Sequence, residues 1–217
     1  MENKSSPLTR ILLFALITLT LSACVTPSTQ GPVSSTTSVG TPRNQTLIFQ
    51  TFDGKTNTPD LMNPLMNYAI WRGFRELGWG YLWEMDTATG KPYGELAADL
   101  PEALNSQHTQ FRVKLKPGIY WSDGVEFTSD DVIYTLDTYF KYKTKLTYSG
   151  ISTITSYVKS YQKIDKYTFD VETVSPAYDF ATVMGVYTWG SAFNIVPKHI
   201  FEKQADVSAF HNTKPVT

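Results

Sequence analysis

The acidic residues, the histidines and the single cysteine are the residues of this sequence that could do chemistry. Asp130 and Asp131 could form a catalytic carboxylate pair, but neighbouring residues of a helix point apart, and acidic residues in a first turn are typical of helix capping. No nucleophile motif or phosphate-binding loop is present. The sequence therefore predicts a protein that is not an enzyme and that needs no metal or cofactor. The three histidines are far apart and lack metal-ligand spacing: His108, His199 and His211.

Cys24 lies where a thiol has a specific use. The apolar run Ile11–Leu21 follows the basic residues Lys4 and Arg10, and it is too short for a bilayer core, which needs about 20 apolar residues. Two small residues follow, so Leu21-Ser22-Ala23-Cys24 resembles the bacterial lipobox, in which the thiol receives a diacylglyceryl group and a peptidase then cuts before it. The sequence predicts a lipoprotein signal peptide over residues 1–23 and a lipid on Cys24, which would hold the protein on a membrane. The alternative is a secretory signal with an incidental cysteine.

Residues 24–43 differ in composition from the rest of the chain. Ser, Thr, Pro and Gly dominate the stretch and no apolar period runs through it, so it cannot bury enough surface to fold. A lipid, a flexible tether and then a domain is the layout of a protein that is held on a membrane and works in the water above it. We expect the folded part to begin at about residue 44.

The composition of the chain excludes several functional classes. The 217 residues carry a formal net charge of −1, and a near-neutral chain does not favour nucleic-acid binding, which needs a clustered basic surface. A single cysteine permits no disulfide within the chain, so the fold must depend on its hydrophobic core. Aromatic residues make up 14% of the sequence, which indicates a large core, a ligand surface or both.

The folded part mixes strand and helix signals. Phe111–Lys116 alternates apolar and polar residues, as a strand with one buried face does, whereas Thr46–Phe52 is apolar on both faces. Thr128 is the expected N-cap of a helix. Strands and helices do not alternate strictly, so the fold class is α/β or α+β with a mixed sheet. The other predicted elements are a hairpin of 158–164 and 167–173, a helix from Asn63-Pro64, a helix from Ser175-Pro176 to Gly185, and a helix over Lys198–Gln204.

The stretch from Glu95 to Phe140 carries the most specific pattern in the sequence. It reads ELAADLPEALNSQHTQFRVKLKPGIYWSDGVEFTSDDVIYTLDTYF and resembles the signature region of family 5 of the bacterial extracellular solute-binding proteins, the oligopeptide, dipeptide and nickel type. Pro101-Glu102 departs from the family's usual aromatic residue, and Ser129 from its common alanine. The matching residues are Leu96-Ala97, Phe111, Val113, Leu115, Gly118, Trp121, Asp123-Gly124, Thr128, Asp131 and Val132, and the other matching blocks are Met62-Asn63-Pro64, Tyr167-Thr168 and Ile195–His199.

The resemblance implies a fold and a division into domains. The fold would be a periplasmic-binding-protein type II-like clamshell, in which a solute binds between two lobes, a hinge closes and the closed form docks on a membrane permease. Members of the family are much longer than this chain, so we expect a truncated chain with the first lobe and its inserted subdomain and without the second lobe. The expected boundaries are 44–65 for the start of lobe I, 66–158 for the inserted subdomain and 159–217 for the return into lobe I.

Candidate ligand residues come from the resemblance and from one glycine-rich segment. In the family, the loop after the first strand and the segment before the Pro-Lys-His block lie near the ligand. Aromatic rings can stack on sugar faces or pack peptide side chains, and Asp53 could meet an amine or a hydroxyl. Core packing is the alternative for each ring. Trp121–Gly124 and His199 are expected to be structural. The candidates are Phe52, Asp53, Trp71, Trp79, Tyr81, Tyr187, Thr188 and Trp189.

The function implied by the resemblance is solute capture for import. The protein would be a lipid-anchored substrate-binding protein of an ABC importer, located on the outer face of the cytoplasmic membrane, with an oligopeptide or an oligosaccharide as its ligand and the permease subunits as its partners. Aromatic richness favours a sugar, and family frequency favours a peptide. The alternative is a surface sensor or interaction lipoprotein that uses the same fold without transport.

Overall fold

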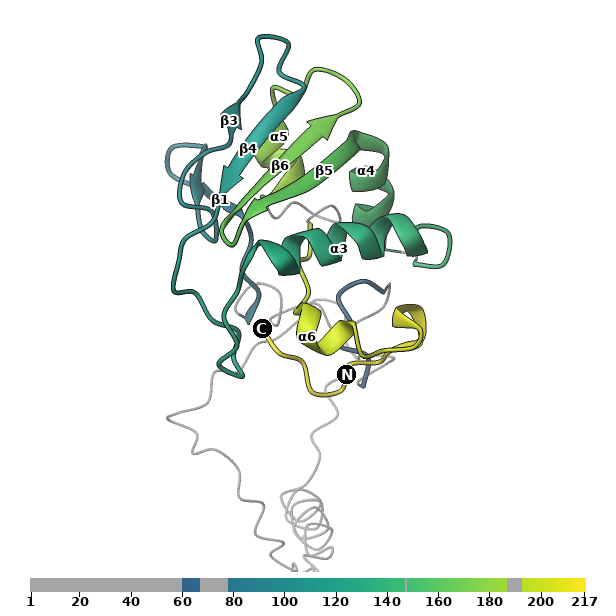
Figure 1. The fold of residues 1–217 in the computed structure, drawn as a ribbon. Helices are drawn as coiled ribbons and strands as arrows, with labels where there is room; N and C mark the ends of the chain where they lie inside the picture. The colour runs from purple at the N-terminus through teal and green to yellow at the C-terminus, as the bar shows by residue number, and fades with distance from the viewer. Residues whose placement is uncertain (1–59, 67–77, 147, 187–192) are drawn as a thin grey trace, which may run out of the picture. The chain divides into compact units, whose positions relative to one another are not determined.

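The computed structural model describes residues 60–66, 78–146, 148–186 and 193–217 (Figure 1). The chain divides into two compact units, Met1–Ile48 and Phe49–Thr217, and every described residue belongs to the second unit. The predicted signal peptide, the tether and the strand expected over Thr46–Phe52 lie outside the described residues.

A four-stranded sheet joins segments that are far apart in the sequence (Figure 1). The two arms of the predicted hairpin are both present, and the predicted strand Phe111–Lys116 overlaps the observed strand β4, which begins one residue earlier and ends two residues earlier, so these predictions are confirmed. The sequence predicts a mixed sheet, whereas every pairing among the described strands is antiparallel. The strands, in spatial order, are β3 (Glu102–Ala103), β4 (Gln110–Lys114), β6 (Thr168–Thr173) and β5 (Val158–Asp165).

Strands β4 and β6 have one buried and one exposed face, as their alternation predicts. Phe111 lies opposite Val171 in the register, and both side chains are buried. On the other face, Arg112 lies opposite Asp170. The guanidinium of Arg112 donates two hydrogen bonds, of 2.8 and 2.9 Å, to the two carboxylate oxygens of Asp170. This cross-strand pair helps to fix the register of the sheet on the face that meets water.

Helix α3 (Ser129–Tyr142) begins where the sequence predicts. The hydroxyl oxygen of Thr128 accepts a hydrogen bond from the backbone N–H of Asp130, and the carboxylate of Asp131 accepts one from the backbone N–H of Thr128. These reciprocal bonds form a capping box, which satisfies backbone donors that the first turn leaves without helical partners. The helix packs against β5 and β6.

The remaining helices are short, and one of them was not predicted. The sequence of α4 reads SGISTITSY, and β-branched and hydroxyl residues give weak helix signals. Several of its hydroxyls donate to backbone carbonyls one turn earlier, which satisfies them within the helix. The last predicted helix, Lys198–Gln204, is confirmed at its start and ends earlier. The bounds are α4 (Ser149–Tyr157), α5 (Phe180–Met184), α6 (Lys198–Phe201) and the 3₁₀ turn η2 (Val207–Ala209).

Helix α5 begins later than the sequence predicts. Its N-cap is Asp179, four residues after the predicted start at Ser175. The N–H of Ala177 donates to the carbonyl of His108 at 2.8 Å, so the preceding stretch bonds to the loop before β4 and not to itself. The predicted end at Gly185 is confirmed.

A second, smaller sheet was not predicted. It is the hairpin of β1 (Trp83–Asp86) and β2 (Lys91–Gly94). The carboxylate of Asp86 accepts a hydrogen bond from the N–H of Ala88 at 2.8 Å, and the turn ends at Gly90, which has a φ of 68°. Strands of four residues are too short to give a clear alternation, so the turn residues were the stronger signal.

Aromatic residues form the centre of the core. The ring of Phe180 on α5 stacks on Phe111 with centroids 4.2 Å apart, and the ring of Trp83 meets Phe180 edge-on at 6.2 Å. Gly185 permits this packing, because a Cβ atom there would lie 2.2 Å from a ring carbon of Trp83. Much of the aromatic content that the composition shows is therefore used for packing.

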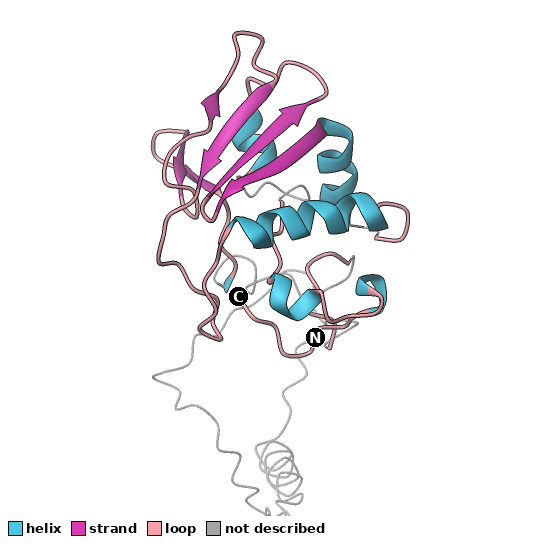
Figure 2. Cartoon of the chain, viewed as in Figure 1, coloured by secondary structure: helices cyan, strands magenta, loops and turns pink. Residues whose placement is uncertain are grey.

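The four-stranded sheet crosses a predicted domain boundary. Strand β4 ends before residue 158, β5 begins at that residue and β6 follows it, yet all three belong to one sheet (Figure 2). We call residues 78–186 the sheet body, with residue 147 outside the description, and residues 193–217 the terminal segment. The division into lobe I and an inserted subdomain stays a prediction.

Candidate ligand-binding wall

The described residues include two of the eight candidate ligand residues. Trp79 and Tyr81 are 7% and 2% exposed, and both belong to the hydrophobic core. Their burial favours the packing alternative, while a role in ligand binding stays a prediction for both. The other candidates lie outside the described residues, as does Cys24: Phe52, Asp53, Trp71, Tyr187, Thr188 and Trp189.

A half-buried carboxylate lies beside this aromatic segment. The Oε2 atom of Glu95 accepts a hydrogen bond from the backbone N–H of Tyr81 at 2.6 Å. Burial raises the pKa of Glu95 above its usual range, although the bond from Tyr81 acts in the opposite direction. Lys116 is close enough to stabilise the charge, but its Nζ donates to the carbonyl of Gly94 at 3.0 Å. Glu95 therefore holds the backbone of the segment and bears a charge that its surroundings disfavour.

Replacing Glu95 by glutamine is expected to leave the fold intact and to stabilise it slightly at pH 7. The amide oxygen can still accept the bond from Tyr81, and the buried charge is removed. A carboxyl whose pKa is raised on folding stabilises the fold at low pH and loses that contribution as the pH rises. The gain of the variant should therefore be largest at pH 7, at most about 1 kcal/mol after screening by water, and should vanish towards pH 4.

Thermal unfolding of both proteins between pH 4 and pH 8 measures this difference. Glu84→Gln is the matched control, because Glu84 lies nearby on β1 and contributes to the raised pKa of Glu95 only through its charge. A variant Glu95→Gln that is less stable than the parent at pH 7 would show that the charge itself is needed.

Two buried asparagines join the family block around residues 62–64 to the terminal segment. The side-chain amide of Asn63 donates to the carbonyls of Val207 and Phe210 at 2.9 and 2.8 Å. The side-chain amide of Asn194 donates to the carbonyl of Pro64 at 3.1 Å. These bonds connect positions more than 125 residues apart in the sequence, and both asparagines are at most 1% exposed. The segment 60–66 is thereby fixed to the terminal segment.

The turn after Trp121 contacts helix α6. The carboxylate of Asp123 lies 2.7 Å from Nε2 of His199, and its other oxygen accepts from the N–H of Val125 at 3.2 Å. Partial burial acts to raise the pKa of Asp123, but the hydrogen bonds from His199 and Val125 outweigh it and hold the pKa below its usual range. Gly124 has a φ of 86°, which explains a glycine at this turn. This geometry supports the expectation that the turn and His199 are structural.

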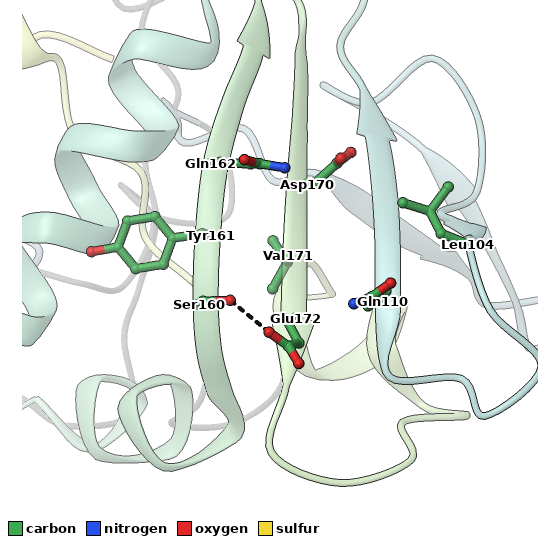
Figure 3. Close-up of a pocket in the computed structure, with 8 residues that line it drawn as sticks. All are labelled: Leu104, Gln110, Ser160, Tyr161, Gln162, Asp170, Val171 and Glu172. Carbon is green, nitrogen blue, oxygen red and sulfur yellow. Dashed lines mark hydrogen bonds between the residues drawn. The ribbon is translucent and has the colours of Figure 1, made fainter.

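A shallow polar hollow lies on the exposed face of the four-stranded sheet (Figure 3). Its volume is about 300 Å³. Figure 3 shows Gln162 beside Asp170 and Gln110 beside Glu172, with Leu104 at one side. The sequence did not indicate this hollow, because its residues become neighbours only across strands.

The charges around the hollow are paired. Glu172 accepts hydrogen bonds from Lys159 at 2.7 Å and from Ser160 at 2.9 Å, and Asp170 holds Arg112. Paired, water-facing charges are ordinary for the exposed face of an antiparallel sheet. Trp79 and Tyr81, the two described candidate ligand residues, do not line the hollow.

The described ranges bear on metal binding and on membrane insertion. Among those residues, no three His, Cys, Asp or Glu side chains lie close enough together to hold a metal ion. Within the same ranges, no helix has the length and the apolar character needed to cross a membrane.

Comparison with known proteins places this geometry among known folds. The model of the bacterial extracellular solute-binding proteins, family 5 (middle), matches residues 91–217. The periplasmic oligopeptide-binding protein of an oligopeptide ABC transporter from Thermotoga maritima has 28% sequence identity to the aligned part and a TM-score of 0.52. The mannohexaose-bound structure of that protein gives 26% identity and the same TM-score. Each alignment covers 64% of this chain and 24% of the solved one.

A more distant structure has the same fold. The periplasmic binding protein DppA from Helicobacter pylori, solved with the peptide STSA, aligns with a TM-score of 0.55 at 18% identity and covers 72% of this chain and 33% of its own. A comparison with curated proteins gives no match. This chain thus spans about a quarter to a third of the length of these solved structures. The predicted fold class, part of a periplasmic-binding-protein clamshell, is confirmed.

Proposed function

Because this chain belongs to family 5 of the bacterial extracellular solute-binding proteins, we propose that it captures an oligopeptide or an oligosaccharide outside the cytoplasmic membrane and delivers it to an ABC permease. The observation that carries the proposal is the match of the family over residues 91–217, which includes the sheet and helix α3. The contact between Asp123 and His199 supports it, because it joins the two blocks that the sequence shares most clearly with the family.

The relative from Thermotoga maritima supports both ligand classes. It is described as an oligopeptide-binding protein, and it was also solved with mannohexaose bound. Aromatic rings serve either ligand, since they stack on the faces of sugars and pack the side chains of peptides. We assign the ligand contacts to the candidates other than the buried Trp79 and Tyr81, above all Phe52, Trp71 and Trp189, with Asp53 as a hydrogen-bond acceptor.

The N-terminal sequence supports anchoring by a lipid. A basic start, the apolar run Ile11–Leu21 and the tetrapeptide Leu21–Cys24 fit a lipoprotein signal. A diacylglyceryl group on Cys24 would hold the protein at the membrane surface. The tether over residues 24–43 would let the folded part reach the permease.

The ligand proposal predicts a thermal stabilisation of the chain. A ligand at a hundred times its dissociation constant stabilises the folded state by about 2.7 kcal/mol, which corresponds to a rise of roughly 5–10 °C in Tm for a chain of this size. The measurement is a thermal-shift titration of the full chain with mannohexaose and, separately, with a mixture of short peptides. We expect one of the two to raise Tm in proportion to the logarithm of its concentration.

Two variants test where the ligand binds. Trp189→Ala should abolish the rise in Tm, whereas Tyr178→Ala, which changes an aromatic ring that is 80% exposed on the sheet body, should leave it unchanged. A chain that neither probe stabilises would contradict the ligand proposal and leave the family membership untouched. A rise in Tm that persists in Trp189→Ala would remove that residue from the site.

A further inference from the structure

Helix α3 presents one hydrogen-bond acceptor per turn to the start of the terminal segment. The acceptors lie at every fourth helical position, and the donors are backbone N–H groups at every second position of the stretch from residue 194 to Lys198, the first residue of helix α6. The helix and the stretch run in opposite directions, because the residue number of the acceptor in α3 falls as the residue number of the donor rises. The three bonds run from Lys198 N to Asp131 Oδ1 at 2.9 Å, from Val196 N to Thr135 Oγ1 at 3.0 Å and from Asn194 N to Tyr139 OH at 3.1 Å.

The two spacings match because of backbone geometry. Four residues of an α-helix rise about 6.0 Å, and two residues of an extended chain span about 6.6 Å. The difference of about 0.6 Å per step is small enough for three consecutive bonds to form with good lengths. We call these three bonds the α3 ladder.

Each acceptor of the ladder is itself held in place. The hydroxyl of Thr135 donates to the carbonyl of Asp131 at 2.7 Å, so its oxygen is left facing Val196. The second oxygen of Asp131 accepts from the N–H of Thr128 at 3.0 Å. The hydroxyl of Tyr139 lies 3.4 Å from the carbonyl of Asn194, to which it donates. A rung therefore cannot rotate without breaking a second hydrogen bond.

The ladder lies in the core and not at the surface. Thr135, Tyr139 and Val196 are 0% exposed, and Asp131 is 4% exposed. Water cannot replace a lost rung there, so a backbone N–H without its acceptor stays unpaired. Pro197, which lies between two donors, has no N–H and so requires no acceptor. The ladder thus binds the main chain and sets the register of residues 194–198.

We infer that Thr135 is a positioning residue, which fixes the register of residues 194–198 along α3 and joins the sheet body to the terminal segment as one unit. In a solute-binding protein this unit would move as a single wall when a ligand is captured. The movement of this unit as one wall rests on the proposed function, whereas the hydrogen bonds of the ladder do not depend on it.

Hydrogen exchange of the full chain without ligand tests the inference. In the parent protein, the amides of residues 194, 196 and 198 should exchange at one common slow rate, shared with the amides in the middle of α3. Thr135→Val keeps the size of the side chain and removes the acceptor. It should speed exchange at Val196 by at least about tenfold and leave the amides of β4 within about threefold of the parent.

Thr135→Ser is the matched control, because it keeps the hydroxyl and should restore the slow rate at Val196. Equal rates in the valine and serine variants, or an acceleration spread evenly over β4 and α3, would overturn the assignment of Thr135. If the valine variant does not fold, the exchange rates of the parent protein test the inference by themselves. Fast or unequal exchange of the amides of residues 194, 196 and 198 in the parent would also overturn the assignment of Thr135. These measurements use no ligand, so a failure of the ligand proposal leaves them unaffected.

Discussion

Replacing Asp131 by alanine is expected to lower the free energy of unfolding by about 2–3 kcal/mol. The change removes the acceptor of two backbone N–H groups, those of Thr128 and Lys198, which donate to its two oxygens at 3.0 and 2.9 Å. A buried donor that loses its partner costs about 1–3 kcal/mol. Burial raises the pKa of Asp131, so the charged form is disfavoured and its removal offsets part of this loss.

The adjacent residue provides the matched control. Asp130 is partly exposed, and its carboxylate pairs with Lys163 at 2.7 Å. Exposed ion pairs contribute about 0–1 kcal/mol, so Asp130→Ala should change the free energy of unfolding by less than about 1 kcal/mol. Asp131→Asn should fall between the two alanine variants, because its amide oxygen can accept one of the two bonds.

Denaturant unfolding of the parent and the three variants measures these differences in the free energy of unfolding. In thermal unfolding, Tm should fall by roughly 4–12 °C in Asp131→Ala. A loss in Asp130→Ala as large as in Asp131→Ala would mean that charge at the start of α3, and not the paired backbone donors, stabilises the fold.

The sequence could predict the turn and the cap because both depend on residues within a few positions of each other. Gly124 takes a positive φ, and Asp123 bonds to the N–H two residues on, both of which follow from local backbone chemistry. The same holds for Thr128 and Asp131 in the capping box. The alternation of β4 likewise requires no knowledge of the rest of the chain.

The second partner of Asp131 could not be predicted in this way. Lys198 lies 67 positions further along the chain, and no local pattern states which distant N–H will meet a carboxylate. The bond between Asn194 and Pro64 and the all-antiparallel order of the described strands are long-range features of the same kind. A signal existed for the ladder, namely polar residues four positions apart, at 131 and 135, on the buried side of the helix. Capping explained the first of them, and the second has no such local explanation.

The candidate site was harder to predict than the fold. The glycines around Trp79 and Tyr81 make both rings candidates from the sequence, and yet both are buried in the core. An aromatic residue in a glycine-rich stretch has the same local sequence whether it packs inside or faces a ligand. The direction of its side chain depends on elements that are distant in sequence, such as the stretch around Glu95, whose backbone and side chain both bond to this segment.

Replacing Cys24 by serine is expected to move the protein from the membrane fraction to the soluble fraction almost completely. Each buried methylene group contributes about 0.8 kcal/mol, so two acyl chains hold a protein durably where one chain is marginal. A serine hydroxyl is a far weaker nucleophile than a thiol, so the variant should receive no lipid. The measurement is fractionation of cells that produce the parent chain or the variant, with the mass of the N-terminal peptide determined in each.

Mass determination separates the two ways in which the variant could stay on the membrane. An uncleaved apolar run, Ile11–Leu21, would hold the chain by itself, and it would be seen as a chain that still begins near residue 1. Val25→Ala is the control, because it changes the next residue and leaves Leu21–Cys24 intact, so it should remain lipidated and membrane-bound. A cleaved Cys24→Ser chain that still fractionates with membranes would contradict the lipid anchor, and the tether would then have to be explained without it.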